Sequence, residues 1–137
     1  MKLRLLIASS VFVWVSSALA APPAPAAAAA PAGPCEGLAG AEATSCWAKE
    51  VSAVQVTLNE KIAAASDKLK AAKKDALVEV LKKSQYDWVV SRTSHCEFIE
   101  KAEAGTAVAA ISRSACLYRT TQSRIAAVGL LISNLGG

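Results

Sequence analysis

The sequence has few aromatic residues and, over its central part, none of the residues that interrupt helices. Aromatic residues make up 5% of the 137 residues, so a core must be built mainly from Leu, Val, Ile and Ala. Such a core is thin for a short chain, which has room for one domain and not for two. Between Gly40 and Gly105 there is no glycine and no proline. The absence of breakers in a stretch rich in Ala, Lys, Glu, Leu and Val predicts long helices.

The sequence also lacks the residue patterns of common catalytic and metal sites. It contains one histidine, His95, and no C-x-x-C, G-x-x-x-x-G-K, G-x-G-x-x-G or H-E-x-x-H motif. Neither a nucleophile with its base nor a zinc site is therefore indicated. His95 follows the apolar spacing of its segment and is interpreted as a packing residue. We predict a protein that is not an enzyme and that needs neither a cofactor nor a metal.

The first twenty residues have the pattern of a cleavable secretory signal. Lys2 and Arg4 precede an apolar stretch at 5–15, and Ala18-Leu19-Ala20 forms a small-x-small cleavage site. The apolar stretch is too short for a membrane span and no second one follows, so we expect no transmembrane segment after cleavage. Residues 21–34 contain only Ala, Pro and one Gly and are predicted to be an extended linker. A folded domain is expected over residues 35–137, in the periplasm or outside the cell.

Three apolar series predict an all-α protein, a three-helix up-down-up bundle with two disulfides. The spacing of three and four residues is that of one helix face. The first series is Trp47, Val51, Val54, Leu58, Ile62, Ala65 and Leu69; the second is Leu77, Leu81, Ser84, Trp88, Arg92, His95 and Ile99; the third is Ile111, Ala115, Tyr118, Ile125, Val128, Ile132 and Leu135. We place the turns near 73–75, with Asp75 as a cap, and at Gly105, with Thr106 as the cap of the last helix.

Four cysteines, Cys35, Cys46, Cys96 and Cys116, form an even set in a chain predicted to be exported. Their spacings of 11, 50 and 20 residues do not resemble a zinc site, so two disulfides are expected. With turns near 74 and 105, Cys96 and Cys116 lie at similar levels of neighbouring helices. Cys46 lies near the same end, and the levels alone leave the pairing open.

The order of several short motifs is similar to that of a known family. The motifs are Cys35 to Cys46 with Glu42, Leu58-Asn59, Gln85-x-x-Trp88-x-x-x-Arg92-x-x-x-Cys96, and Cys116-Leu117 followed by Thr120, Thr121 and Arg124. This order resembles the small exported bacterial domain named after the LprI-type lysozyme inhibitor, over nearly all of 35–128. The resemblance implies the pairs Cys35–Cys46 and Cys96–Cys116. It also implies a protein that protects the bacterial wall by capping the cleft of a muramidase.

Polar residues occur at positions where the helix spacing would place apolar ones. They are Asn59, Arg92 and Arg124, with Trp88 one turn before Arg92. A buried guanidinium needs hydrogen-bond acceptors and can stack on an aromatic ring. We interpret the four residues as a structural polar layer that sets helix register. The alternative is that Trp88 and Arg92 help to form a recognition surface.

Six lysines gather around the first predicted turn: Lys68, Lys70, Lys73, Lys74, Lys82 and Lys83. No aromatic residues alternate with them, which argues against nucleic-acid binding and favours a solvated tip. After removal of the predicted signal the chain has 13 basic and 11 acidic residues, so its overall charge implies no particular partner.

Two functions follow from these patterns. The first is an exported binding protein whose partner is lysozyme or another envelope protein, acting as a lysozyme inhibitor. The second is a structural or interaction module of the bacterial envelope without that activity. A thiol–disulfide helper is disfavoured because C-x-x-C is absent.

Overall fold

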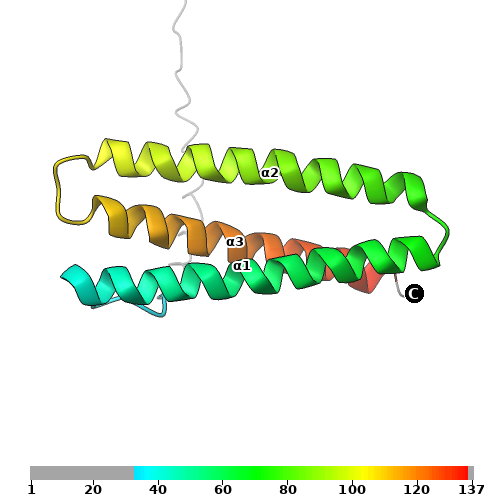
Figure 1. The fold of residues 1–137 in the computed structure, drawn as a ribbon, viewed down its shortest axis with the longest axis horizontal. Coiled ribbons are helices and arrows are strands. Elements are labelled where there is room, and N and C mark those ends of the chain that lie inside the picture. Colours follow the sequence, from blue (N-terminus) through cyan, green and yellow to red (C-terminus); the bar gives the residue numbers. More distant parts are fainter. Residues whose placement is uncertain (1–32, 136–137) are drawn as a thin grey trace, which may run out of the picture. The chain divides into compact units, whose positions relative to one another are not determined.

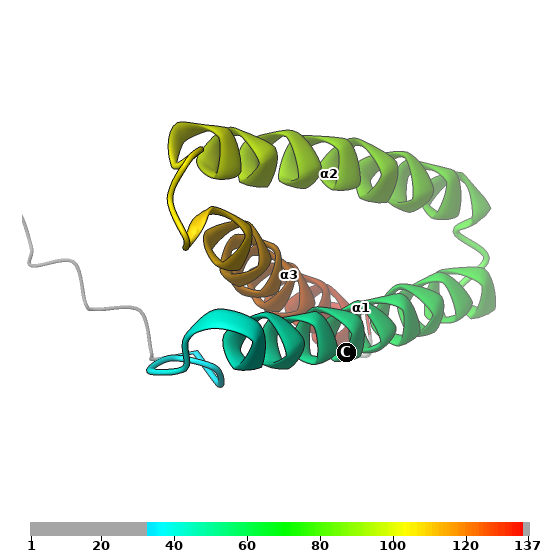
Figure 2. The same ribbon diagram turned by 60° about the vertical axis from the view of Figure 1, so that its left-hand side comes forward.

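The computed structural model describes residues 33–135, which form three α-helices and no strand within that range. Helix α1 spans Gly40–Ala71, α2 spans Asp75–Ala102, and α3 spans Ala109–Asn134. The helices lie side by side, and short connections join consecutive helices at alternate ends (Figures 1 and 2). The all-α class, the three helices and the two disulfides are thereby confirmed. The predicted signal peptide at 1–20 and nearly all of the linker at 21–34 lie outside the described residues.

The apolar core lies toward the end where α1 turns into α2. Leu58, at 0% exposure, is its most enclosed large side chain. The buried cluster consists of Leu58, Ala65, Leu69, Val78, Leu81 and Val128, with Ile62, Trp88, Ile125, Ile132 and Leu135 packed against it. The interface between α1 and α3 is the most extensive and that between α1 and α2 the smallest. Helix α2 therefore depends mainly on α3 for its place in the bundle. Among residues 33–135, no helix is long and apolar enough to pass through a bilayer.

The predicted inner face of the second helix is wrong at both of its ends. Val78 is 3% exposed whereas Leu77 is 47% exposed, so the inner stripe begins one residue later than expected. At the other end Cys96 is fully buried and the neighbouring His95 is exposed rather than packed. One residue corresponds to a rotation of about 100° around a helix. Since α2 faces mainly α3, its buried stripe is set by that contact.

Two predicted helix caps are also wrong. Asp75 is the first residue of α2 rather than its cap, and α3 begins after Val108 rather than at Thr106. The Thr106 hydroxyl donates instead to the carbonyl of Glu103, at 2.8 Å, within the turn that follows α2. The loop therefore uses the side chain that the sequence offered as a cap, and neither helix has a side-chain cap.

The turn between α1 and α2 is a Schellman motif with a lysine at its left-handed position. The amide of Lys74 donates to the carbonyl of Leu69 at 2.9 Å, and the amide of Lys73 donates to that of Lys70 at 2.8 Å. This pattern requires a left-handed residue at the first position after the helix cap, and glycine usually occupies it. Here Lys73 does so, with φ of 56°. For a residue with a side chain this conformation costs about 1–2 kcal/mol.

The two disulfides join Cys35 to Cys46 and Cys96 to Cys116, as the family resemblance implied. The first fastens the segment before α1 onto that helix, with Cα atoms 5.9 Å apart. The second links α2 to α3, with Cα atoms 5.6 Å apart. Cys35, Cys96 and Cys116 are buried, so the bridges form part of the core at the end opposite the α1–α2 turn.

Candidate functional site

A polar cluster around Trp88 and Arg92 connects all three helices. The Arg92 side chain extends from α2, and its Nη1 donates to Gln55 Oε1 on α1 at 2.8 Å and to Thr121 Oγ1 on α3 at 2.9 Å. Its guanidinium carbon lies 4.7 Å from the centre of the Trp88 ring, a cation–π distance. Thr121 is 1% exposed, and its hydroxyl donates a hydrogen bond to the carbonyl of Leu117. One guanidinium thus ties together three helices.

Arg124 and Asn59 extend this cluster toward the surface. Arg124 Nε donates to Gln85 Oε1 at 3.2 Å, and its Nη2 donates to Ser84 Oγ at 3.1 Å. Its guanidinium carbon lies 5.7 Å from the Trp88 ring centre, so both arginines approach that ring. Asn59 is exposed and accepts a hydrogen bond from Gln55 Nε2 at 3.0 Å. The structure therefore brings the four predicted residues into one connected set, and their role as a register-setting layer stays a prediction.

Arg92 is a cation without a carboxylate partner in the described part of the chain. No acidic oxygen lies within 4.0 Å of its nitrogens there, and its buried Nε has no hydrogen-bond partner. Burial lowers the pKa of Arg92 from its usual value, although a guanidinium remains charged at neutral pH. Within the described residues, the charge of the guanidinium is therefore stabilised by neutral oxygen acceptors and by the indole ring. These groups must lie at suitable distances and angles, because a buried charge without partners is costly.

Sequence reasoning missed the acceptors of these arginines. Gln55 and Gln85 look like ordinary surface glutamines, because a long polar side chain gives no signal of its direction. Gln85 and Thr121 both occur in the motifs quoted above, and this was the available signal. A further signal is a threonine one helical turn from a predicted core residue, because a hydroxyl that becomes buried needs a hydrogen-bond partner.

At the disulfide end, a groove of about 560 Å³ lies beside the segment that precedes α1. Trp47 lines it; this residue is 2% exposed and meets the Tyr118 ring edge-on at 5.5 Å between centroids. His95 and Glu103 also line it, and one carboxylate oxygen of Glu103 is buried without a hydrogen bond. The lining of the groove thus combines an aromatic ring with polar side chains.

An ion pair between Glu36 and Arg119 closes one side of this groove. Arg119 on α3 donates to the Glu36 carboxylate in the segment before α1. The hydrogen bond from the Gly33 backbone lowers the pKa of Glu36, and the bond from Arg119 lowers it further. Together with Cys35–Cys46, this pair holds the segment against the bundle.

The pKa of Glu36 predicts a pH dependence of stability. A lowered folded-state pKa means that this carboxylate stabilises the fold above its ordinary pKa, and that the contribution is lost as pH falls through the lowered value. Glu36→Gln should therefore lower Tm at pH 7, and the effect should shrink as the pH is lowered toward 2.5. Thermal melts of both proteins across this range measure the difference. Glu60→Gln, at an exposed carboxylate on α1 without an ion pair in residues 33–135, is the matched control. Equal Tm differences at the two pH values would contradict the prediction.

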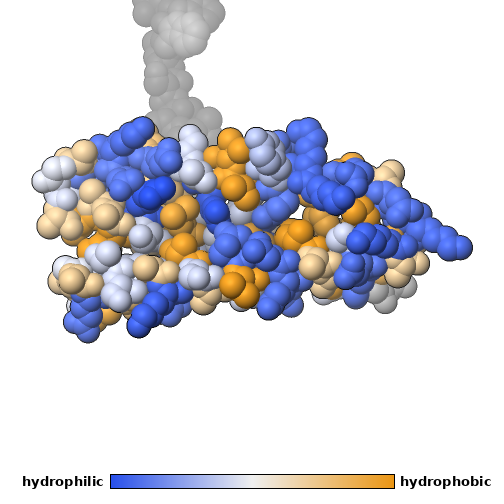
Figure 3. All heavy atoms as spheres, in the orientation of Figure 1, coloured by the Kyte–Doolittle hydropathy of each residue, from blue (hydrophilic) through white to orange (hydrophobic). Residues whose placement is uncertain are grey.

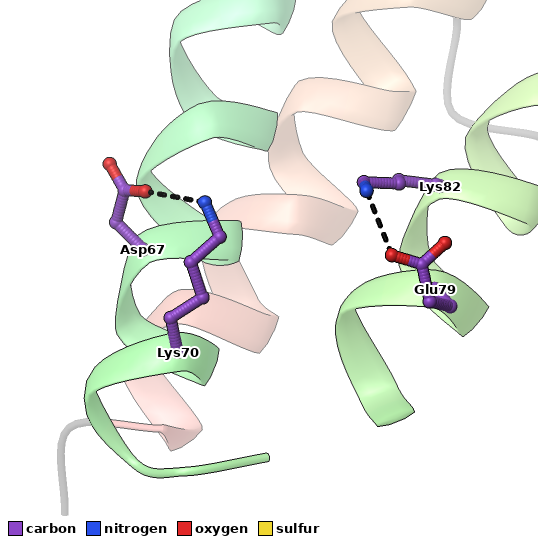
Figure 4. A network of polar contacts seen from close by, with 4 residues as sticks. All are labelled: Asp67, Lys70, Glu79 and Lys82. Atoms are coloured by element: carbon purple, nitrogen blue, oxygen red, sulfur yellow. Dashed lines mark hydrogen bonds and ion pairs between the residues drawn. The ribbon is translucent and has the colours of Figure 1, made fainter. Parts of the chain in front are cut away.

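The opposite end carries the six lysines, which we call the lysine tip: Lys68, Lys70, Lys73, Lys74, Lys82 and Lys83. In Figure 3, which has the orientation of Figure 1, the end of the bundle with the α1–α2 turn protrudes on the right and is strongly hydrophilic. Lys70 pairs with Asp67 at 3.4 Å and Lys82 with Glu79 at 2.8 Å, as Figure 4 shows.

The six lysines differ in their partners. Lys83 pairs with Asp87 at 2.6 Å, and Lys68 donates to the carbonyl of Ile132 at 3.3 Å. Within residues 33–135, the side chains of Lys73 and Lys74 have neither an ion pair nor a hydrogen bond.

An apolar groove of about 270 Å³ lies next to the lysine tip, between α2 and α3. Three of its side chains are notably exposed: Leu77 at 47%, Val80 at 62% and Leu131 at 38%. Arg124 reaches the other end of the groove and connects it to the polar cluster. The misplaced Leu77 of the sequence prediction is thus an exposed lining residue here.

Among residues 33–135, no three acidic, histidine or cysteine side chains come together in a way that could hold a metal ion. All four cysteines are bonded in disulfides.

The chain matches the model of a known protein family. The model of the family described as "Lysozyme inhibitor LprI" matches residues 35–128, which include both disulfides and the polar cluster. No curated protein and no solved structure matches the chain.

Proposed function

Because this chain belongs to the LprI lysozyme inhibitor family, we propose that it is a non-enzymatic binding protein that blocks a muramidase and so protects the bacterial cell wall. The observation that carries the proposal is the extent of the family match. It runs from the first cysteine, Cys35, through most of α3, and so takes in every cross-link of the bundle.

The chemistry of muramidases sets what such an inhibitor must do. These enzymes cleave a glycosidic bond between two carboxylic side chains at the bottom of an open cleft. A protein can stop them by filling the cleft and offering hydrogen-bond donors to those carboxylates. The binding group must be held rigidly, because ordering a flexible one on binding lowers affinity. Three helices with two cross-links provide a rigid body of this kind.

The place of action follows from the same features. Disulfides form and persist outside the cytoplasm, where both a bacterial wall and a muramidase are encountered. We propose that residues 1–20 are a signal peptide, that 21–34 are a linker, and that the mature protein is periplasmic or secreted.

A lysis assay tests the proposal. Oxidised protein comprising residues 21–137 is added in increasing amounts to muramidases of several types acting on bacterial cell walls. Inhibition at micromolar concentration or below is expected, and it should disappear when the protein is reduced and alkylated, because the cross-links keep the surface in shape.

The absence of inhibition with every muramidase type would contradict the proposal. The apolar groove between α2 and α3 would then favour the second function, an interaction module of the envelope, since exposed apolar surface flanked by polar residues is typical of protein contacts.

A further inference from the structure

Lys73 occupies a backbone conformation that suits glycine better than lysine. Of the four residues with left-handed φ in the described range, three are glycines: Gly37, Gly40 and Gly105. The fourth is Lys73, at the outermost part of the α1–α2 turn. Glycine there would keep the Schellman hydrogen bonds and remove the steric cost. A cation just after the C-terminus of α1 interacts favourably with the helix dipole, but by about 0.3–1 kcal/mol, which is less than the cost of the left-handed backbone. The fold alone therefore does not account for the lysine.

The charges around Lys73 point to an external partner of opposite sign. Four of the six lysines of the tip have a carboxylate or carbonyl partner, whereas Lys73 and Lys74 have none among residues 33–135. Asp75, next in the chain, is the first residue of α2 and has no lysine within ion-pair distance in that range. A carboxylate at this position already interacts favourably with the helix dipole. The two ammonium groups are therefore available to an anionic group of another molecule.

The apolar groove lies at the same end of the bundle. Leu69 and Leu77, which line it, flank the turn that carries Lys73 and Lys74. Protein interfaces commonly combine an apolar centre with a polar rim, and the anchoring residues are rigidly presented. The tip and the groove together have this composition.

We propose that the lysine tip is the muramidase-binding surface, with Lys73 and Lys74 entering the cleft and donating to its two catalytic carboxylates. This inference rests on the proposed function and names the surface that performs it. The two carboxyl groups of such enzymes are about 5–9.5 Å apart, depending on the mechanism. The hydrogen bonds of the turn fix the backbone of these two adjacent lysines, and their side chains are long enough to place the ammonium groups at that separation. The exposed groove lined by Leu77 and Val80 packs against the rim of the cleft.

The test uses variants that are expected to weaken inhibition without lowering thermal stability. Lys73→Gly should melt at the wild-type Tm or above it, because glycine relieves the left-handed backbone, and yet it should inhibit less. With Lys74→Ala added, the concentration needed for half-inhibition should rise by about tenfold or more, as expected for a central anchor. Lys49→Ala removes the same charge at the disulfide end and should leave inhibition unchanged. Lys73→Arg with Lys74→Arg keeps both charges and should retain most of it.

Competition with a soluble chitin oligosaccharide provides a second measurement. The oligosaccharide occupies the cleft, so it should displace the wild-type protein from the enzyme in a binding assay. Wild-type inhibition together with full inhibition by the Lys73→Gly/Lys74→Ala protein would overturn the tip assignment and leave the proposed function intact. Failure of the oligosaccharide to compete would do the same. Absence of inhibition by the wild-type protein would overturn both.

Discussion

Replacing Cys96 and Cys116 together by alanine is expected to lower the free energy of unfolding by about 3 kcal/mol or more. The bridge closes a loop of 20 residues, and removing it restores that freedom to the unfolded chain. It also leaves two buried positions without their sulfur atoms in a core that has little apolar bulk. Domains of this size are stable by only about 5–15 kcal/mol, so the loss is a large share of the total.

The matched control is the Cys35→Ala/Cys46→Ala protein. Loop entropy predicts that removing this bridge also lowers the free energy of unfolding by about 3 kcal/mol. The segment that the bridge holds, however, lies outside the three helices. We therefore expect its loss to release residues 33–39 while the bundle keeps its cooperative transition. Urea unfolding followed by circular dichroism measures both proteins. If the Cys96→Ala/Cys116→Ala protein proves as stable as the wild type, α2 is held by packing alone and the prediction is wrong.

Trp88→Ala should lower the free energy of unfolding by about 3 kcal/mol. The ring packs against the apolar core and also lies beside the guanidiniums of Arg92 and Arg124. Its removal leaves a cavity and takes the π-face from Arg92, a partly buried cation without an ion-pair partner in residues 33–135.

Tyr86→Ala is the control for this substitution, because it removes a large aromatic ring from the same helix at a position that is 69% exposed. We expect a change within about 0.5 kcal/mol for it. Urea midpoints of the two variants, compared with that of the wild type, give the difference. Similar losses for both would mean that the packing of Trp88 against the core and the arginines adds nothing beyond what an exposed ring contributes, and the prediction would be wrong.

The helices could be predicted because their signal is local. The uninterrupted run from residue 40 to 105 and the spacing of residues such as Leu58 and Leu69 depend only on neighbours in the chain. The orientation of α2 could not be predicted, because Leu77 and Val78 are both good core residues. The choice between them depends on how closely α2 approaches α1 and α3, which no local pattern records.

The arginines and the tryptophan of the polar cluster were predicted from the sequence, but the hydrogen bonds that connect the cluster were not. Arg92 was recognisable because it follows Trp88 on a face that should be apolar. Its acceptor Gln55 is 37 residues away, and the Glu36–Arg119 pair joins residues 83 apart. Such contacts depend on the final arrangement of the helices. The disulfide pairing belongs to the same class, and the family resemblance provided what helix levels could not.

The weak contact between α1 and α2 has a consequence for how the protein matures. Because its middle helix is fastened by a cross-link, the bundle reaches its full stability only after Cys96 and Cys116 have been oxidised. Before that step α2 should separate from the other two helices more often, because fewer contacts and no covalent bond hold it. Oxidation therefore decides when the surface shared by the three helices becomes rigid.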